Sequence, residues 1–131
     1  MFIDASALCA ILLSESDAAI FADKIEAAPR RMTSAVAVYE TVRALLREGR
    51  GDAGRARQIA AEFLVEAQIE CIEIGEAEME AALDAMSRFG RGHHAASLNM
   101  GDCFAYACAR TRNLPLLFKG NDFGKTDIPA A

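Results

Sequence analysis

Short apolar segments alternate with longer helical patterns along the chain, and this alternation restricts the possible folds more than any other feature. Four segments have strand character, and Ile128 marks a possible fifth: residues 2–5, 30–33, 69–74 and 115–118. Between them, apolar residues recur at helical spacing, as at Phe21, Ile25 and Ala28. Short strands that alternate with helices predict an α/β fold, with a central, mostly parallel sheet of four to five strands and helices on both faces.

Several residues are expected to begin the helices or to face the core. Ser14 and Asp17, in the sequence SESD, are typical of a capping box for the helix that ends at Pro29. Ser34 is expected to cap the helix that ends at Gly49. The residues expected to mark three later helices are Ile59, Phe63 and Leu64 in the first, Met79, Leu83 and Met86 in the second, and Asp102 to Arg112 in the third.

Length and composition predict one compact domain over residues 1–131, because 53% of the residues are hydrophobic and no long polar tract occurs. No apolar run approaches the roughly 20 residues of a membrane span. The start also lacks the basic region and cleavage site of a signal peptide, so we expect a cytoplasmic protein. The cysteines form no C-x-x-C pair and are expected to be buried, reduced thiols: Cys9, Cys71, Cys103 and Cys108.

The net charge of −5 argues against a protein that coats nucleic acid nonspecifically, since such a protein would be basic. Five arginines nevertheless fall within a short stretch of the chain: Arg43, Arg47, Arg50, Arg55 and Arg57. This cluster could contact RNA phosphates, or it could be the solvated face of two helices. Both interpretations fit the sequence equally well.

Asp4 stands at the junction of two apolar segments, the strand at Phe2 and Ile3 and the helix expected from Ser6 to Leu13. An unpaired buried carboxylate costs several kcal/mol, so such a group is normally paired, capping a helix or bound to a metal ion. Asp4 also follows the carboxyl end of a strand, which is where ligands bind in parallel sheets. Its position therefore indicates a functional site.

Three more acidic residues are expected at comparable places: Glu40 on a small apolar helix face, Asp102 at a helix start and Asp122 after the last buried strand. Each has an ordinary alternative. Glu40 could face solvent or pair with Arg43 or Arg47, Asp102 could favour the helix dipole, and Asp122 could form an Asx-turn. Two helix positions and two strand ends can, however, converge at one edge of a parallel sheet.

Convergent acids would determine the chemistry of the site. Several carboxylates in one pocket cannot all ionise unless a cation neutralises them. Oxygen ligands without histidine or thiolate select Mg²⁺ or Mn²⁺ over zinc. Because a bound Mg²⁺ attracts phosphate oxygens and lowers the pKa of a water molecule, the acids predict hydrolysis of a phosphoryl group.

Four motifs carry a resemblance that spans residue 3 to about residue 128: IDASA, SAVAVYE, GDCFAYACA and PLLFKGNDF. They resemble PIN-domain ribonucleases, most closely the VapC-type toxins of bacterial toxin–antitoxin pairs. GDCFAYA followed by LLFKGNDF is quite specific, whereas IDASA alone is a weak motif. The resemblance implies a PIN-like three-layer α/β/α sandwich and a metal-dependent endoribonuclease that uses Mg²⁺, with Mn²⁺ as an alternative.

The resemblance also implies the roles of individual residues. Asn121 could take part of the fourth acid's role, because the family often has two acids in the last turn where this chain has Asn121 and Asp122. Ser6 resembles the small hydroxyl residue that supports the metal or the scissile phosphate, and an ordinary helix N-cap is the alternative. The implied metal-binding acids are Asp4, Glu40, Asp102 and Asp122.

The partners follow from the same resemblance. The implied substrate is a structured RNA, usually tRNA or ribosomal RNA. A cognate antitoxin is expected to hold the enzyme inactive by filling a groove near the site with its C-terminal segment. We expect a homodimer that forms a hetero-oligomer with this antitoxin.

Other classes of protein fit less well. A phosphatase of the haloacid dehalogenase type needs a second Asp two residues after the first, where this chain has Ser6. A phosphoreceiver domain needs an acceptor Asp after a central strand, and IECIEIGE supplies none. A PIN-like module that binds RNA or protein without cutting stays open as the alternative, although four retained acids favour catalysis.

Two histidines and two tyrosines complete the candidates. His93 and His94 could contact RNA or donate a proton, but they are expected to be ordinary residues of a glycine-rich loop. Tyr39 and Tyr106 are expected in the core or at an interface and not as platforms for base stacking.

Overall fold

The centre of the fold is a sheet of four short strands in the order β3-β2-β1-β4. All three strand pairs are parallel, as predicted. The structure, a computed structural model, describes residues 1–131. Ala130 forms only an isolated bridge to Leu116, so no fifth strand begins at Ile128. The strands are β1 (Phe2–Ile3), β2 (Met32–Ser34), β3 (Glu70–Ile72) and β4 (Leu116–Leu117).

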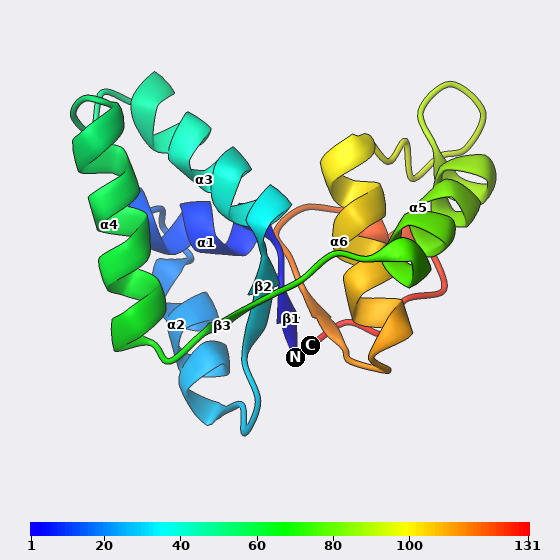
Figure 1. Cartoon of the computed structure of the whole chain (residues 1–131), viewed down its shortest axis with the longest axis horizontal. Coiled ribbons are helices and arrows are strands. Elements are labelled where there is room, and N and C mark those ends of the chain that lie inside the picture. The colour runs from blue at the N-terminus through cyan, green and yellow to red at the C-terminus, as the bar shows by residue number, and fades with distance from the viewer.

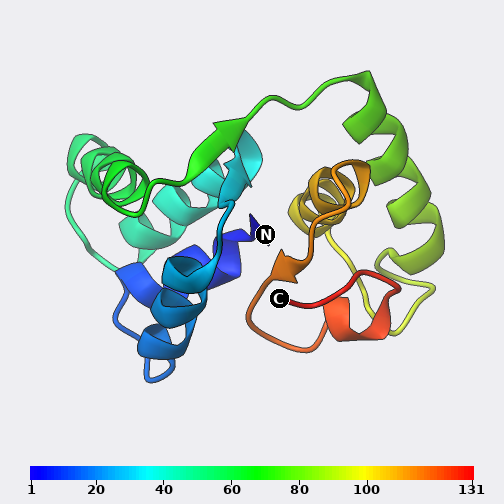
Figure 2. The same cartoon turned by 90° about the horizontal axis from the view of Figure 1, so that it is seen from below.

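Helices connect the strands and cover both faces of the sheet, which makes the predicted three-layer α/β/α sandwich. Helices α1 to α4 lie on one side, and α5 and α6 lie on the other (Figure 1 and Figure 2). None of these helices is both long enough and apolar enough to cross a membrane. They are α1 (Ala5–Leu12), α2 (Ala18–Ala27), α3 (Ala35–Arg47), α4 (Ala53–Glu66), α5 (Glu76–Phe89) and α6 (Met100–Thr111), followed by a single 3₁₀ turn, η1 (Phe123–Lys125).

Two hydrophobic cores lie on the two faces of the sheet, because successive residues of a strand point to opposite sides. Phe2 and Leu116 enter the core beneath α5 and α6. Their neighbours Ile3 and Leu117 enter the core beneath α1 and α2. The strands are thus held from both sides, which fixes the position of their carboxyl ends.

The helix starts were predicted with mixed success. Ser34 caps α3, since its hydroxyl accepts a hydrogen bond from the Ala37 N–H at 3.3 Å. The predicted capping box in SESD is wrong. Asp17 precedes α2 without a side-chain capping bond, and Ser14 has a φ of 59° within a turn. The strand predicted over residues 2–5 is shorter, because α1 already begins at Ala5.

The inward face of α5 differs from the prediction. Met79, Leu83 and Met86 are 43%, 48% and 52% exposed, and α5 instead buries its face containing Ala82 and Ala85. Both faces have apolar residues at helical spacing, and the alanine face is the one that packs on α6, in the core that also holds Ala105 and Ala109.

The expectation of buried thiols is correct only in part. Cys103 and Cys108 are buried, Cys9 is half-buried and Cys71 is exposed; all four are free.

Candidate functional site

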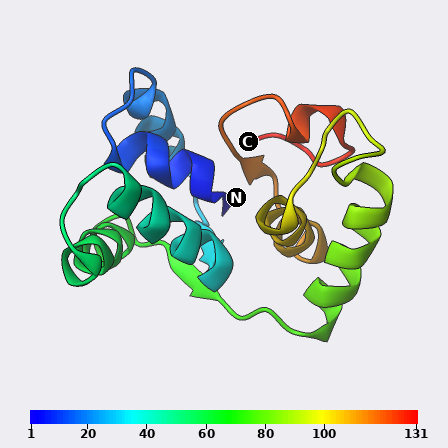
Figure 3. The ribbon, with the colours of Figure 1, turned by 90° about the horizontal axis from the view of Figure 1, so that it is seen from above.

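The carboxyl ends of β1, β2 and β4 and the start of α6 lie at the same edge of the sheet (Figure 3). Asp4 directly follows β1, and Glu40 lies in the first half of α3, which follows β2. Asp102 lies in the first turn of α6, and Asp122 lies in the loop after β4. The fold therefore brings all four predicted acids to one region of the molecule.

Asp4 is 4% exposed and caps α1. Its Oδ2 accepts two hydrogen bonds from Ser6, one from the backbone N–H at 2.9 Å and one from the hydroxyl at 2.5 Å. Burial raises the pKa of Asp4, and the Ser6 hydrogen bonds oppose this shift. Capping thus gives Asp4 a structural role, but the carboxylate still carries the cost of burial.

Ser6 joins the ends of two neighbouring strands. Its hydroxyl donates to Asp4 after β1 and accepts a hydrogen bond at 2.9 Å from the backbone N–H of Lys119 after β4. The alternative interpretation of Ser6 as the helix N-cap is wrong, because Asp4 holds that position. The Lys119 ammonium pairs with Glu15 and Asp17, so Lys119 gives the site a backbone contact while its charge is neutralised elsewhere.

Asp102 and Asn99 form a reciprocal cap at the start of α6. Asn99 Oδ1 accepts from the Asp102 N–H at 3.1 Å, and Asp102 Oδ2 accepts from the Asn99 N–H at 2.8 Å. Burial, with the charges of Asp4 and Asp122, raises the pKa of Asp102 to about 6, although the Asn99 N–H and Arg91 lower it. Asn99 was not among the residues predicted from the sequence, although the N-x-x-D spacing of a capping box indicates it.

Glu40 is half-buried and makes no ion pair with Arg43 or Arg47, so that alternative is wrong. Burial raises the pKa of Glu40, and the charges of Asp4 and Asp102 raise it further, while Arg43 lowers it. The carboxylate of Glu40 lies against Gly101, directly before Asp102. Glu40 therefore faces the other acids and not the solvated side of α3.

The loop after β4 carries the two remaining candidates. Asp122 and Asn121 are both exposed. Asp122 begins η1 through its backbone carbonyl, which accepts from the Lys125 N–H at 3.1 Å, but its side chain makes no capping bond, so the predicted alternative of an Asx-turn is wrong. Its influence on the site is electrostatic, through the raised pKa of Asp102.

The donor set and the charge of this site fit a hard cation. The four side chains offer only carboxylate oxygens, which are typical ligands of Mg²⁺ and Mn²⁺. Burial and mutual repulsion oppose ionisation of Asp4, Glu40 and Asp102, and a cation would remove that penalty. As placed, the side chains do not form a group of three that could hold a metal ion. The four acids thus suit a hard cation by their oxygen donors and their charge, while their side chains do not surround a metal position.

The tyrosines and histidines have separate structural roles. Tyr106 is buried, as predicted, and donates to Asp127 at 2.6 Å. Tyr39 is 65% exposed, with Arg43 6.0 Å from its ring centroid, so a core position for Tyr39 is wrong. His93 Nε2 lies 2.9 Å from the Ser87 carbonyl oxygen, and His94 Nδ1 accepts from the Ala96 N–H at 3.0 Å. Both histidines are loop residues, as expected, and their rings contact backbone atoms nearby.

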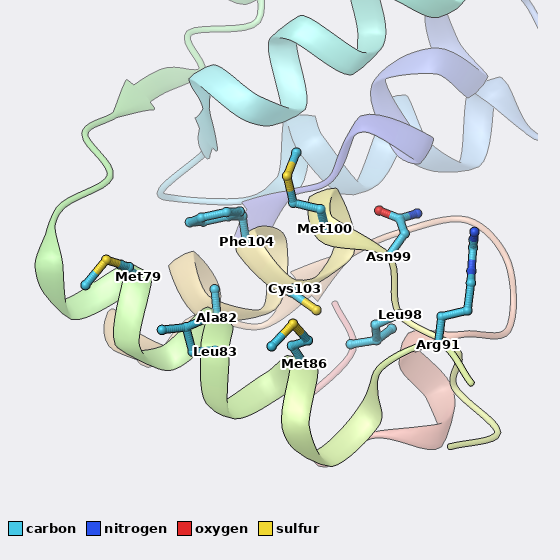
Figure 4. A pocket seen from close by; sticks show the side chains of 10 residues that line it. All are labelled: Met79, Ala82, Leu83, Met86, Arg91, Leu98, Asn99, Met100, Cys103 and Phe104. Carbon is cyan, nitrogen blue, oxygen red and sulfur yellow. The ribbon is translucent and has the colours of Figure 1, made fainter. Parts of the chain in front are cut away.

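An apolar groove of about 440 Å³ lies beside the acidic site, between α5 and α6. Figure 4 shows its lining, with the exposed Met79, Leu83 and Met86 on α5 and Met100 on α6. Arg91 and Asn99 lie at one end, where the groove adjoins the cap of Asp102 (Figure 4). The four acids themselves do not line the groove.

The chain is similar to known proteins over nearly its whole length. The PIN domain model matches residues 1–129. The VapC ribonuclease Mb0640 of Mycobacterium bovis is 40% identical over 128 residues, which cover 98% of this chain and 95% of that protein.

Two solved structures share the fold. The crystal structure of Mycobacterium tuberculosis VapC20, a sarcin–ricin loop cleaving toxin, has a TM-score of 0.79 at 19% identity and covers 99% of this chain and 97% of that chain. A toxin–antitoxin complex from Klebsiella pneumoniae has a TM-score of 0.69 at 16% identity, over 96% of this chain and 92% of that one. With its site at the carboxyl edge of a parallel sheet and its relatives among ribonucleases, the chain belongs to the PIN-domain family and, within it, to the VapC ribonucleases.

Proposed function

We propose that this protein is a metal-dependent endoribonuclease that acts as the toxin of a toxin–antitoxin pair and hydrolyses phosphodiester bonds in a structured RNA. The observation that carries the proposal is the convergence of Asp4, Glu40 and Asp102, whose pKa values are all raised, at one edge of the sheet. Ribonuclease relatives of similar length support the same reaction. A purely structural site would have no reason to collect carboxylates that repel each other.

In this proposal Asp4, Glu40 and Asp102 hold Mg²⁺ or Mn²⁺, with Asp122 as a fourth acid. The ion would neutralise the carboxylates, attract the scissile phosphate and lower the pKa of a water molecule. Ser6 fixes Asp4 relative to the loop after β4. Asn99 fixes one oxygen of Asp102, which restricts the rotation of that carboxylate.

The positive charge needed for RNA lies beside the acids. Arg43 and Arg91 form no ion pair, and their charges act on Glu40 and Asp102, respectively. We propose that these two arginines contact RNA phosphates on either side of the scissile bond, where backbone contacts supply affinity without sequence preference. The substrate class is tRNA or ribosomal RNA; the structurally similar VapC20 cleaves the sarcin–ricin loop.

The partner surfaces are part of the proposal. The groove between α5 and α6 leaves four large apolar side chains exposed, which is typical of a surface that another protein covers. We propose a homodimer that also binds a cognate antitoxin in the cytoplasm, and the Klebsiella pneumoniae complex of similar fold supports an antitoxin partner.

Mapping of RNA ends tests the proposed reaction. Purified protein, free of antitoxin, is incubated with total cellular RNA and Mg²⁺. We expect products with a 5′-phosphate and a 3′-hydroxyl, because activated water attacks and the 2′-hydroxyl need not act. EDTA should stop cleavage, and fresh Mg²⁺ or Mn²⁺ should restore it.

Two variants separate the enzyme from a silent binding module. Asp102→Ala should abolish cleavage while the protein stays folded, since loss of a helix cap costs only about 0.5–2 kcal/mol. Asp52→Ala is the matched control, because Asp52 caps α4 through the Arg55 N–H at 2.8 Å and lies on another helix. Cleavage that survives Asp102→Ala, or products with 2′,3′-cyclic phosphates, would contradict the mechanism. RNA that is bound without new ends would favour the binding module.

A further inference from the structure

Gly101 is buried in the first turn of α6, between Met100 and Asp102. A Cβ atom at this position would lie 2.5 Å from Glu40 Cδ and even closer to both Glu40 carboxylate oxygens. These three atoms are its nearest neighbours, whereas ordinary contacts of a Cβ atom are 3.4–4 Å long. The Glu40 carboxylate therefore occupies the volume that any other side chain at position 101 would need.

The backbone gives no reason for a glycine at this position. The glycines with positive φ are Gly49, Gly51, Gly92 and Gly120, and Gly101 is not among them. Within a helix, glycine is less favourable than alanine because it loses more conformational freedom on folding. The advantage of Gly101 is therefore one of space and not of conformation.

We propose that Gly101 is a positioning residue, whose missing side chain lets the Glu40 carboxylate of α3 lie against α6 beside Asp102. The inference rests on the proposed function in one respect, namely that Glu40 and Asp102 serve the same metal ion. The carboxylate is the far end of a flexible side chain, so a Cβ atom at position 101 would displace the carboxylate and leave the two helices where they are. Asp102 would stay in its cap with Asn99, and the two acids would separate.

Binding of Mn²⁺ to the metal-free protein tests this inference without any assay of activity. The free Mn²⁺ concentration is followed by electron paramagnetic resonance during a titration. Gly101→Ala should weaken binding at least about tenfold, as loss of ligand orientation does at metal sites. Glu40→Gln should weaken it to a similar degree, and the double variant should bind no more weakly than Glu40→Gln alone, because the two changes remove the same ligand.

Gly54→Ala is the matched control for helix propensity. Gly54 is the second residue of α4 after its cap Asp52, as Gly101 is the second residue of α6 after Asn99. A Cβ atom at Gly54 would meet only Asp52 Oδ1, at 3.3 Å. Gly54→Ala should therefore bind Mn²⁺ as the wild type does. Equal affinities of Gly101→Ala and Gly54→Ala, with a wild type that binds Mn²⁺, would overturn the inference.

A second measurement needs no metal. In ¹H–¹⁵N spectra with EDTA, Glu40→Gln should shift the Asp102 amide signal in the wild-type background and leave it nearly unchanged in the Gly101→Ala background, where the carboxylate has already moved away. Equal shifts in the two backgrounds would overturn the inference about Gly101. A wild type that binds no Mn²⁺ would instead overturn the proposed metal dependence, and the spectra would still decide whether Gly101 positions Glu40.

Discussion

Replacement of Asp102 by asparagine should stabilise the metal-free protein at neutral pH, although the same change should remove activity. In the folded chain, burial and the charges of Asp4 and Asp122 raise the pKa of Asp102 from its ordinary 3.8 to about 6. The folded state therefore binds this proton more tightly than the unfolded state. The resulting contribution to stability is complete below pH 3.8 and is lost as the pH rises through 6.

The magnitude follows from the size of the pKa shift. About two pKa units correspond to about 3 kcal/mol, which the ionised Asp102 costs the wild type at pH 7.5. An asparagine at this position is uncharged, and its amide oxygen can still accept the hydrogen bond that the Asn99 N–H gives to Asp102. Asp102→Asn should thus gain up to about 3 kcal/mol at pH 7.5 and only about 0.5 kcal/mol at pH 4.

Urea unfolding in EDTA, followed by circular dichroism at both pH values, measures this difference. Asp52→Asn serves as the control, because asparagine is as good an N-cap as aspartate and Asp52 is exposed. It should change the free energy of unfolding little at either pH. A gain for Asp102→Asn that is absent at pH 7.5, or that is the same at both pH values, would refute the electrostatic reasoning.

Three further predictions concern the metal, the fold and the assembly. Mg²⁺ or Mn²⁺ should raise the Tm of the wild type by binding the native state. Asp4→Asn should remove most of this increase while stabilising the metal-free protein. An equal increase in Tm for the two proteins would exclude the shared metal site. Glu78 is 7% exposed, and the Gly75 N–H together with Thr111 and Arg112 lowers its pKa to about 2. The contribution of ionised Glu78 to stability is present above its ordinary pKa of 4.5 and is lost as the pH falls through 2. Glu78→Gln should therefore cost about 2–3 kcal/mol of unfolding free energy at pH 7 and little at pH 2. Equal urea midpoints for wild type and variant at pH 7 would contradict this. Light scattering at high micromolar concentration should show a homodimer, and a monomer would contradict the proposed assembly.

The sequence was sufficient to predict the sheet and the acids at its edge. Strand-like segments that alternate with helical patterns fix a parallel order, and a parallel sheet gathers its carboxyl ends at one edge. Asp4 and Asp122 follow strands, so their position at the same edge of the sheet is a consequence of topology. Glu40 and Asp102 were placed by the helices that bring them to the same edge, and those helices were recognised from their periodicity.

Contacts between the side chains of two different helices could not be predicted in the same way. In α5, the methionine face and the alanine face both have apolar residues at helical spacing, and the partner helix decides between them. The same is true of Gly101, because its contact with Glu40 depends on how closely α3 approaches α6. The sequence around Gly101 contains no local signal for that distance.

The bond between Ser6 and Lys119 also determines when the site can form. These residues are 113 positions apart, and β1 lies between β2, made early, and β4, made near the end. A chain that is still being synthesised carries Asp4 and Glu40 well before it contains Leu116 and Leu117, whereas Asp102 is made shortly before them. Contacts of such long range form only after the intervening chain is in place. The growing polypeptide therefore contains most of the acids of a nuclease before it contains β4 and the Lys119 N–H that binds Ser6. The site is complete only when this last strand has been made.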